Sequence, residues 1–130
     1  MKRVKTFKFK RNGVVDLTDT PECGCNVIQC GKDKFSIREF RVIGGHDDSL
    51  PYTAILCINN NPLCKCFNDG WGGDTELTPI DNRARAIMAS ANVTLSNYEW
   101  LYCGTKFKLD LGFIADTLAI TESHNIELFK

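Results

Sequence analysis

Two cysteine pairs have the spacing closest to that of a metal site. Cys23 and Cys25 form one Cys-x-Cys pair, and Cys64 and Cys66 form another. Four thiolates brought together can bind zinc in a tetrahedral site. The spacing differs from the paired Cys-x-x-Cys of common zinc knuckles. Three interpretations therefore stay open: a zinc site, a disulfide, or reduced thiols that pack as small apolar side chains.

A glycine-rich loop is the second candidate site. Its residues are Asn68, Asp69, Gly70, Trp71, Gly72 and Gly73. Exposed backbone N–H groups, together with the start of the helix expected to follow, could hold a phosphate or a carboxylate. The loop has no Lys or Arg, however, and Asp74, Glu76 and Asp81 follow it. A structural turn or a protein-contact loop built around Trp71 is therefore the competing interpretation.

The first 11 residues are strongly basic. They contain no acidic residue and include Lys2, Arg3, Lys5, Lys8, Lys10 and Arg11. Because the whole chain has 16 basic and 16 acidic residues, the rest of it is acidic. Such a segment could bind nucleic-acid phosphates. It could equally be a solvated edge strand whose lysines prevent aggregation.

Catalytic patterns are weak. The chain has two histidines, His46 and His124. His46 precedes Asp47 and Asp48, but adjacent side chains in a turn rarely face one another, so a base with an orienting carboxylate is not favoured. No Ser-His-Asp or Cys-His arrangement can be read from the spacing. The sequence favours a protein that is not an enzyme.

A β-hairpin must position the second cysteine pair. Residues 52–58 form the most apolar strand, 63–67 its partner, and Asn59 and Asn60 tolerate the positive φ of a tight turn. With a two-residue turn, Cys57, Cys64 and Cys66 are expected to point to the same face. Cys103 is expected in the core.

Two helices are expected to complete the fold. In the first, Thr78 suits the N-cap, Pro79 the first position and Asp81 the third. Its apolar face would contain Ile80, Ala84, Ile87, Met88 and Ala91. The second helix should run from about 110 to 123, with His124 and Asn125 as its stop. Its inner face would contain Leu111, Ile114, Ala115 and Leu118.

The remaining segments predict further strands. Residues 4–10 and 14–17 resemble two strands joined by an Asn-Gly turn, 18–34 a long loop, and 35–43 a strand. Residues 98–103 are ambiguous between strand and helical turn. Strands first and helices last predict one α+β domain over residues 1–130. Its mainly antiparallel sheet would have four to five strands, with two helices packed on one face.

Composition places the chain among globular proteins, with 43% hydrophobic and 25% charged residues. No apolar run approaches the 18 residues of a membrane span, and no signal peptide is visible. We therefore expect no membrane partner and a cytoplasmic location, where the 7 cysteines stay reduced. The 52–58 strand is apolar on both faces, so a homo-oligomer stays open.

Residues 35–92 resemble small uncharacterised proteins of bacteriophages and mobile elements. The similarity lies in an apolar strand, a tight turn, a short strand and then Asn68-Asp69-Gly70-Trp71-Gly72-Gly73. Those proteins often have Asn-Gly at the turn, where this chain has Asn59-Asn60. The resemblance implies a phage origin and host-cell cytoplasm, but no activity and no site residue.

The sequence thus favours a small non-enzymatic binding protein that inhibits a host or defence factor by protein contact. Two alternatives stay open. One is a zinc-stabilised nucleic-acid module that uses the basic N-terminal segment. The other is a protein that sequesters a nucleotide or another small ligand at the 68–73 loop, with no further cofactor.

Overall fold

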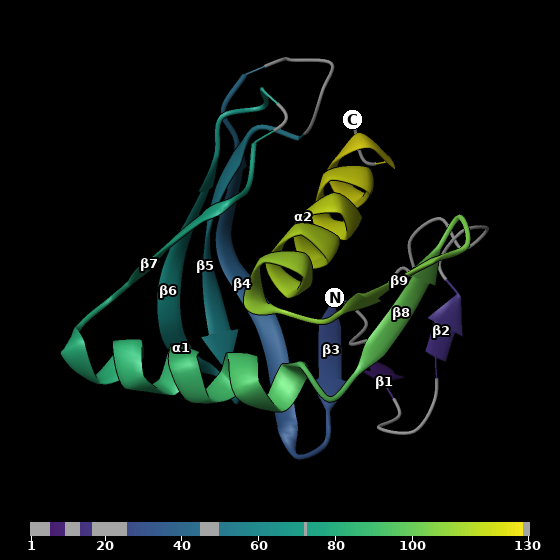
Figure 1. Cartoon of the computed structure of the whole chain (residues 1–130). Coiled ribbons are helices and arrows are strands. Elements are labelled where there is room, and N and C mark those ends of the chain that lie inside the picture. The colour runs from purple at the N-terminus through teal and green to yellow at the C-terminus, as the bar shows by residue number, and fades with distance from the viewer. Residues whose placement is uncertain (1–5, 10–13, 17–25, 45–49, 72, 129–130) are drawn as a thin grey trace.

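The computed structural model describes residues 6–9, 14–16, 26–44, 50–71 and 73–128. Within these ranges the chain forms nine strands and two helices, which confirms the α+β class (Figure 1). In chain order they are β1 (Thr6–Phe9), β2 (Val14–Asp16), β3 (Val27–Cys30), β4 (Asp33–Val42), β5 (Tyr52–Ile58), β6 (Asn61–Asn68), β7 (Glu76–Pro79), α1 (Asn82–Leu95), β8 (Glu99–Tyr102), β9 (Thr105–Lys108) and α2 (Leu111–Leu128).

Six of the described strands form one sheet in the order β1-β3-β4-β5-β6-β7, and β2-β8-β9 form a second. The main sheet is antiparallel except where β1 runs parallel to β3. The expected four to five strands were therefore too few. The expected pairing of the first two strands is also wrong, because β2 instead runs parallel to β8.

Strand β3 lies inside the segment that was expected to be a long loop. Ile28 and Cys30 are buried and alternate with half-buried neighbours, as in a strand with one face on the core. Polar residues and glycines on both sides hide this short pattern in the sequence. The strand that pairs with β1 is β3, and not the segment that directly follows β1 in the chain.

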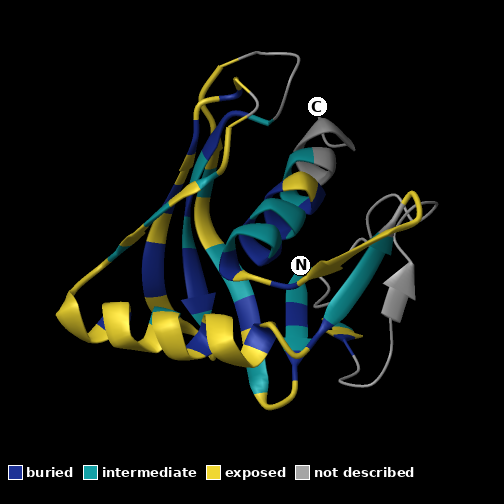
Figure 2. Cartoon of the chain, viewed as in Figure 1, coloured by how far each residue is buried: buried dark blue, intermediate teal, exposed yellow. Residues whose placement is uncertain are grey.

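Both helices lie on the same side of the main sheet (Figure 1). On α2, the expected inner-face residues Leu111, Ile114, Ala115 and Leu118 are all buried. The helix continues to Leu128, so the stop expected at 124–125 is wrong. α1 is exposed along most of its length (Figure 2), and its buried residues are Ala84, Ala91 and Leu95.

The central hairpin has the expected turn, with φ of 51° at Asn59 and 69° at Asn60. The strands change register within the hairpin: Cys57 pairs with Pro62, but Leu56 pairs with Cys64. Leu63 is the extra residue of this bulge. Since directly paired residues share a face, Cys64 and Cys66 face α2 with Leu56, whereas Cys57 does not. The expectation that all three share one face is therefore wrong.

The first helix is capped, but three residues later than expected. Residues 76–79 pair with β6 as an edge strand, which places Thr78 opposite Lys65. Asp81 is the N-cap, and its Oδ1 accepts a hydrogen bond of 2.7 Å from the N–H of Ala84. Ile80 lies before the helix and is 41% exposed, and Ile87 is 37% exposed, so neither belongs to a buried face.

The 98–103 segment is resolved as a strand, β8, which forms a hairpin with β9. Cys103 lies in the turn with φ of 49° and is exposed, so its expected place in the core is wrong. Trp100 of β8 stacks on Phe107 and Phe113, with centroid distances of 4.8 and 4.4 Å. This stack attaches the small sheet to α2. Neither described helix is long and apolar enough to cross a membrane.

The position of the cap gives a first prediction. Asp81→Ala should lower the free energy of unfolding by about 1 kcal/mol, because an N-terminal amide of α1 loses its acceptor. Thr78→Val, which keeps a β-branched residue in β7, should change it by less than about 0.5 kcal/mol. Urea denaturation checks both. The reverse order of effects would contradict the assigned cap.

Candidate binding site at the glycine-rich loop

The loop between β6 and β7 is closed by side chains at its own start. The N–H of Gly70 donates to Oδ1 of Asn68 at 2.8 Å, and the N–H of Trp71 donates to Oδ1 of Asp69 at 3.0 Å. Gly70 has φ of 86°, a conformation that favours glycine. Two of the amides that an anion would need are therefore already bonded within the loop.

Asn68 also connects the loop to the interior. Its Nδ2 donates to the carbonyl of Gly73 at 3.3 Å and to the hydroxyl of Thr75 at 3.0 Å. That hydroxyl in turn donates to Oδ1 of Asp116 on α2. The Tyr52 hydroxyl of β5 donates to the same oxygen at 2.8 Å. The Thr75 and Tyr52 hydroxyls therefore both donate to one carboxylate oxygen, and hydrogen bonds to a charged acceptor are stronger than those between neutral groups.

The electrostatics of this network follow from its burial. Desolvation raises the pKa of Asp116 above its usual value, the two hydroxyl donors oppose this shift, and the charges of Asp110 and Asp74 add to it. Burial, with the neighbouring Asp116, also raises the pKa of Tyr52. The Tyr52 hydroxyl therefore stays protonated and remains a donor at neutral pH.

The cysteines that face α2 are buried thiols. A hydrogen bond between the thiols of Cys64 and Cys66, together with desolvation, raises the pKa of Cys66. Burial, with Asp33 nearby, raises the pKa of Cys30 to about 12. The same hydrogen bond with Cys66 lowers the pKa of Cys64, against the effect of its burial. Within the described ranges no group of three or more His, Cys, Asp or Glu side chains is placed to hold a metal.

Several sequence-predicted residues fall outside the described ranges. These are Gly72, Cys23, Cys25, Lys2, Arg3, Lys5, Lys10, Arg11, His46, Asp47 and Asp48. The zinc site and the nucleic-acid segment therefore stay predictions, with Lys8 of β1 as the described member of the basic group. Of the loop carboxylates, Asp69 and Asp81 accept hydrogen bonds from the backbone.

Four residues near the end of the sheet that carries the loop have exposed apolar side chains, although strand pairing places Val42 on the helix side of the sheet and Phe67 on its outer face. Val42 and Ile43, at the end of β4, are 47% and 45% exposed, Phe67 is 42% exposed, and Trp71 is 67% exposed. Val42 and Asn68 pair with Tyr52 from its two sides, which brings the end of β4 close to the loop. We refer to these four residues as the apolar tip.

Sequence reasoning missed Tyr52, Thr75 and Asp116 as members of the site. A carboxylate among the apolar residues of the second helix was a visible signal for Asp116. Its partners were not visible, because Thr75 and Tyr52 lie 41 and 64 residues away along the chain.

No protein-family model matches the sequence, and no curated protein or solved structure gives a significant match. The resemblance of residues 35–92 to phage and mobile-element proteins therefore stays a prediction.

The raised pKa of Asp116 predicts a pH dependence of stability. The folded protein holds this proton more tightly than the unfolded chain, so the contribution is complete below about pH 4, near the unfolded pKa. It is lost as the pH rises through the folded pKa. The free energy of unfolding should therefore fall between pH 4 and 7 relative to that of Asp116→Asn, which cannot titrate.

Urea denaturation of both proteins across this pH range measures the difference. A difference that is constant with pH, or that grows in favour of the wild type as the pH rises, would contradict a raised pKa.

Proposed function

We propose that this chain is a non-enzymatic binding protein that acts by contact with another protein through the apolar tip. The observation that carries the proposal is the exposure of Trp71 on a loop held by hydrogen bonds. The interface residues that dominate binding energy are enriched in Trp. A loop ordered before binding loses less conformational entropy when a partner arrives.

The same loop is less suited to a phosphate. The amides of Gly70 and Trp71 are occupied by the side chains of Asn68 and Asp69. The exposed carboxylates of Asp74 and Glu76 follow. An anion would therefore meet occupied donors and negative charge, whereas an apolar protein surface would meet the exposed ring of Trp71. These contacts support protein binding over nucleotide sequestration at this end of the molecule.

The partner proposed from the sequence resemblance is a host enzyme or a defence factor, inhibited because the tip covers part of its surface. Pull-down from host lysate with tagged protein, followed by mass spectrometry of the retained proteins, identifies it. A retained protein supports the proposal only if its binding depends on the tip.

Trp71→Ala should weaken binding of the identified partner at least ten-fold, about 1.4 kcal/mol, because a central aromatic contact is removed. Val93→Ala is the matched control, since Val93 is 70% exposed on α1 and does not belong to the tip. Calorimetric titration with the purified partner measures both. The proposal fails if wild type retains no protein, or if the two variants bind equally well.

A further inference from the structure

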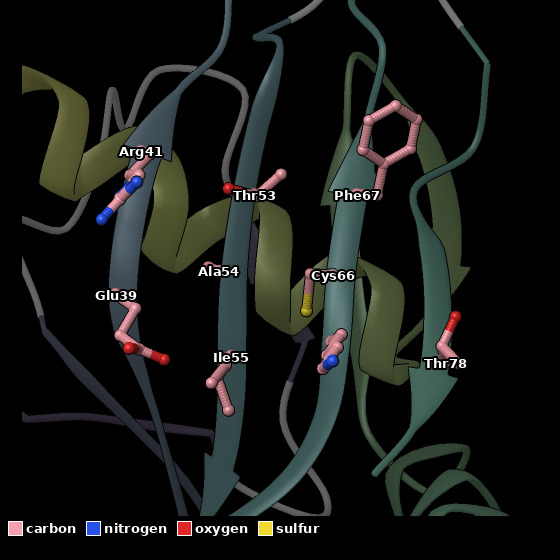
Figure 3. Close-up of a pocket in the computed structure, with 9 residues that line it drawn as sticks. Glu39, Arg41, Thr53, Ala54, Ile55, Cys66, Phe67 and Thr78 are labelled. Carbon is pink, nitrogen blue, oxygen red and sulfur yellow. The ribbon is translucent and has the colours of Figure 1, made fainter.

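The face of the main sheet that points away from the helices is a second candidate surface. Figure 3 looks onto this face, with α2 behind the strands. Cys66 points toward α2, while Arg41 and Phe67 lie on the viewer's side. No described helix covers the outer face of β4, β5, β6 and β7 (Figures 1 and 3).

Strand register sets two rows of side chains across this face. One row runs from Arg41 through Thr53 to Phe67, and the next from Arg38 through Ile55 to Lys65. Between them lies a shallow groove of about 480 Å³. Its lining includes Glu39, Arg41, Thr53, Ile55, Lys65 and Phe67. The groove thus combines apolar surface, hydroxyl groups and long charged side chains.

Five charged side chains lie exposed on this face. Arg38, Arg41 and Lys65 are exposed cations, and Glu39 and Glu76 are exposed carboxylates. None of the five forms a salt bridge in the part of the chain that the structure describes. Arg38 donates a hydrogen bond of 2.7 Å to the carbonyl of Asn60, which fixes its position. The excess charge is positive.

We propose that this outer face binds single-stranded nucleic acid, with a base stacked on Phe67 and phosphates held by Arg41 and Lys65. Lys65 lies two residues before Phe67 on the same face, about 7 Å along the strand. Arg41 lies two strands away in the same row, about 10 Å across the sheet. Long basic side chains at these distances reach the backbone of a strand whose base covers the ring.

The shape of the groove favours a strand over other occupants. Free nucleotides usually bind in concave pockets that bury most of their surface, whereas this groove is open along the sheet. An open sheet with an aromatic side chain and cations suits unstacked bases of a single strand. The bases of a duplex are already stacked on each other, so Phe67 would gain no base contact from it.

The proposal is independent of the basic N-terminal segment and of Trp71. Phe67 belongs to both the apolar tip and the outer face, so it cannot separate the two surfaces. Arg41 and Lys65 lie outside the tip and therefore carry the decisive test. Glu39, the carboxylate in the groove, should oppose binding, which gives a variant with the opposite expected sign.

The experiment measures fluorescence anisotropy of labelled 12-nucleotide oligo(dT) and oligo(U) with the full chain at low and moderate salt. The double variant Arg41→Gln/Lys65→Gln should weaken binding about ten-fold or more. It should also reduce the slope of log K against log salt concentration by about 1.4, because each of the two lost phosphate contacts on a single strand accounts for about 0.7. Glu39→Gln should strengthen binding. Arg83→Gln/Arg85→Gln on α1 is the control of equal charge, and it should bind as wild type does.

Phe67→Ala should also weaken binding, by about ten-fold for one lost stacked base. Circular dichroism confirms that each variant is folded. No anisotropy change up to about 100 µM protein at low salt would overturn the proposal. Equal losses in the outer-face and α1 double variants would also overturn it. If a mononucleotide competes as effectively as the oligomer, the ligand of the groove is a free nucleotide and the proposal of a bound single strand is wrong.

Discussion

A carboxylate that is taken out of water must find donors, and this requirement shapes the part of the molecule proposed to bind. Asp116 lies on α2 between buried Ala115 and Leu118. Tyr52 and Thr75 supply its donors. Because the hydroxyl of Thr75 also accepts a hydrogen bond from Asn68, the need for donors in the interior determines the course of the loop. Removing any member would leave a polar group without its partner, which is costly in a buried site.

The molecule has surfaces with different chemistry. The inner face of the sheet is apolar and covered by the helices, and Cys64 and Cys66 serve there as packed thiols. The loop between β6 and β7 exposes Trp71 at the end of the sheet where β4 also ends. The outer face keeps charged side chains and a half-buried Ile55. Each surface follows from strand alternation together with the positions of the helices.

Local chemistry was sufficient to predict several elements. The turn at Asn59 and Asn60 follows from residues that tolerate positive φ, and the inner face of α2 follows from its helical spacing. Interactions between distant segments were not readable. The bulge at Leu63 reverses the face of Cys57 through one extra residue, which a two-residue turn rule does not detect. The edge strand β7 captures Thr78 and moves the helix cap to Asp81.

The candidate site shows the same division. Asn68, Asp69, Gly70 and Trp71 were predicted from composition as a loop that could bind a partner. What holds the loop was not predicted, because a single sequence does not indicate which strand residue meets a helical carboxylate far along the chain. The parallel pairing of β1 with β3 and of β2 with β8 was missed for the same reason.

The central claim is that the buried network holds the glycine-rich loop in one conformation. Backbone ¹⁵N order parameters of Gly70 and Trp71 test it most directly, in wild type and in Thr75→Val, which keeps the shape of the side chain but removes the hydroxyl. The account predicts values of about 0.85 in wild type, as in the strands, and a clear decrease in the variant. Values below about 0.6 in wild type, or no change in the variant, would contradict it.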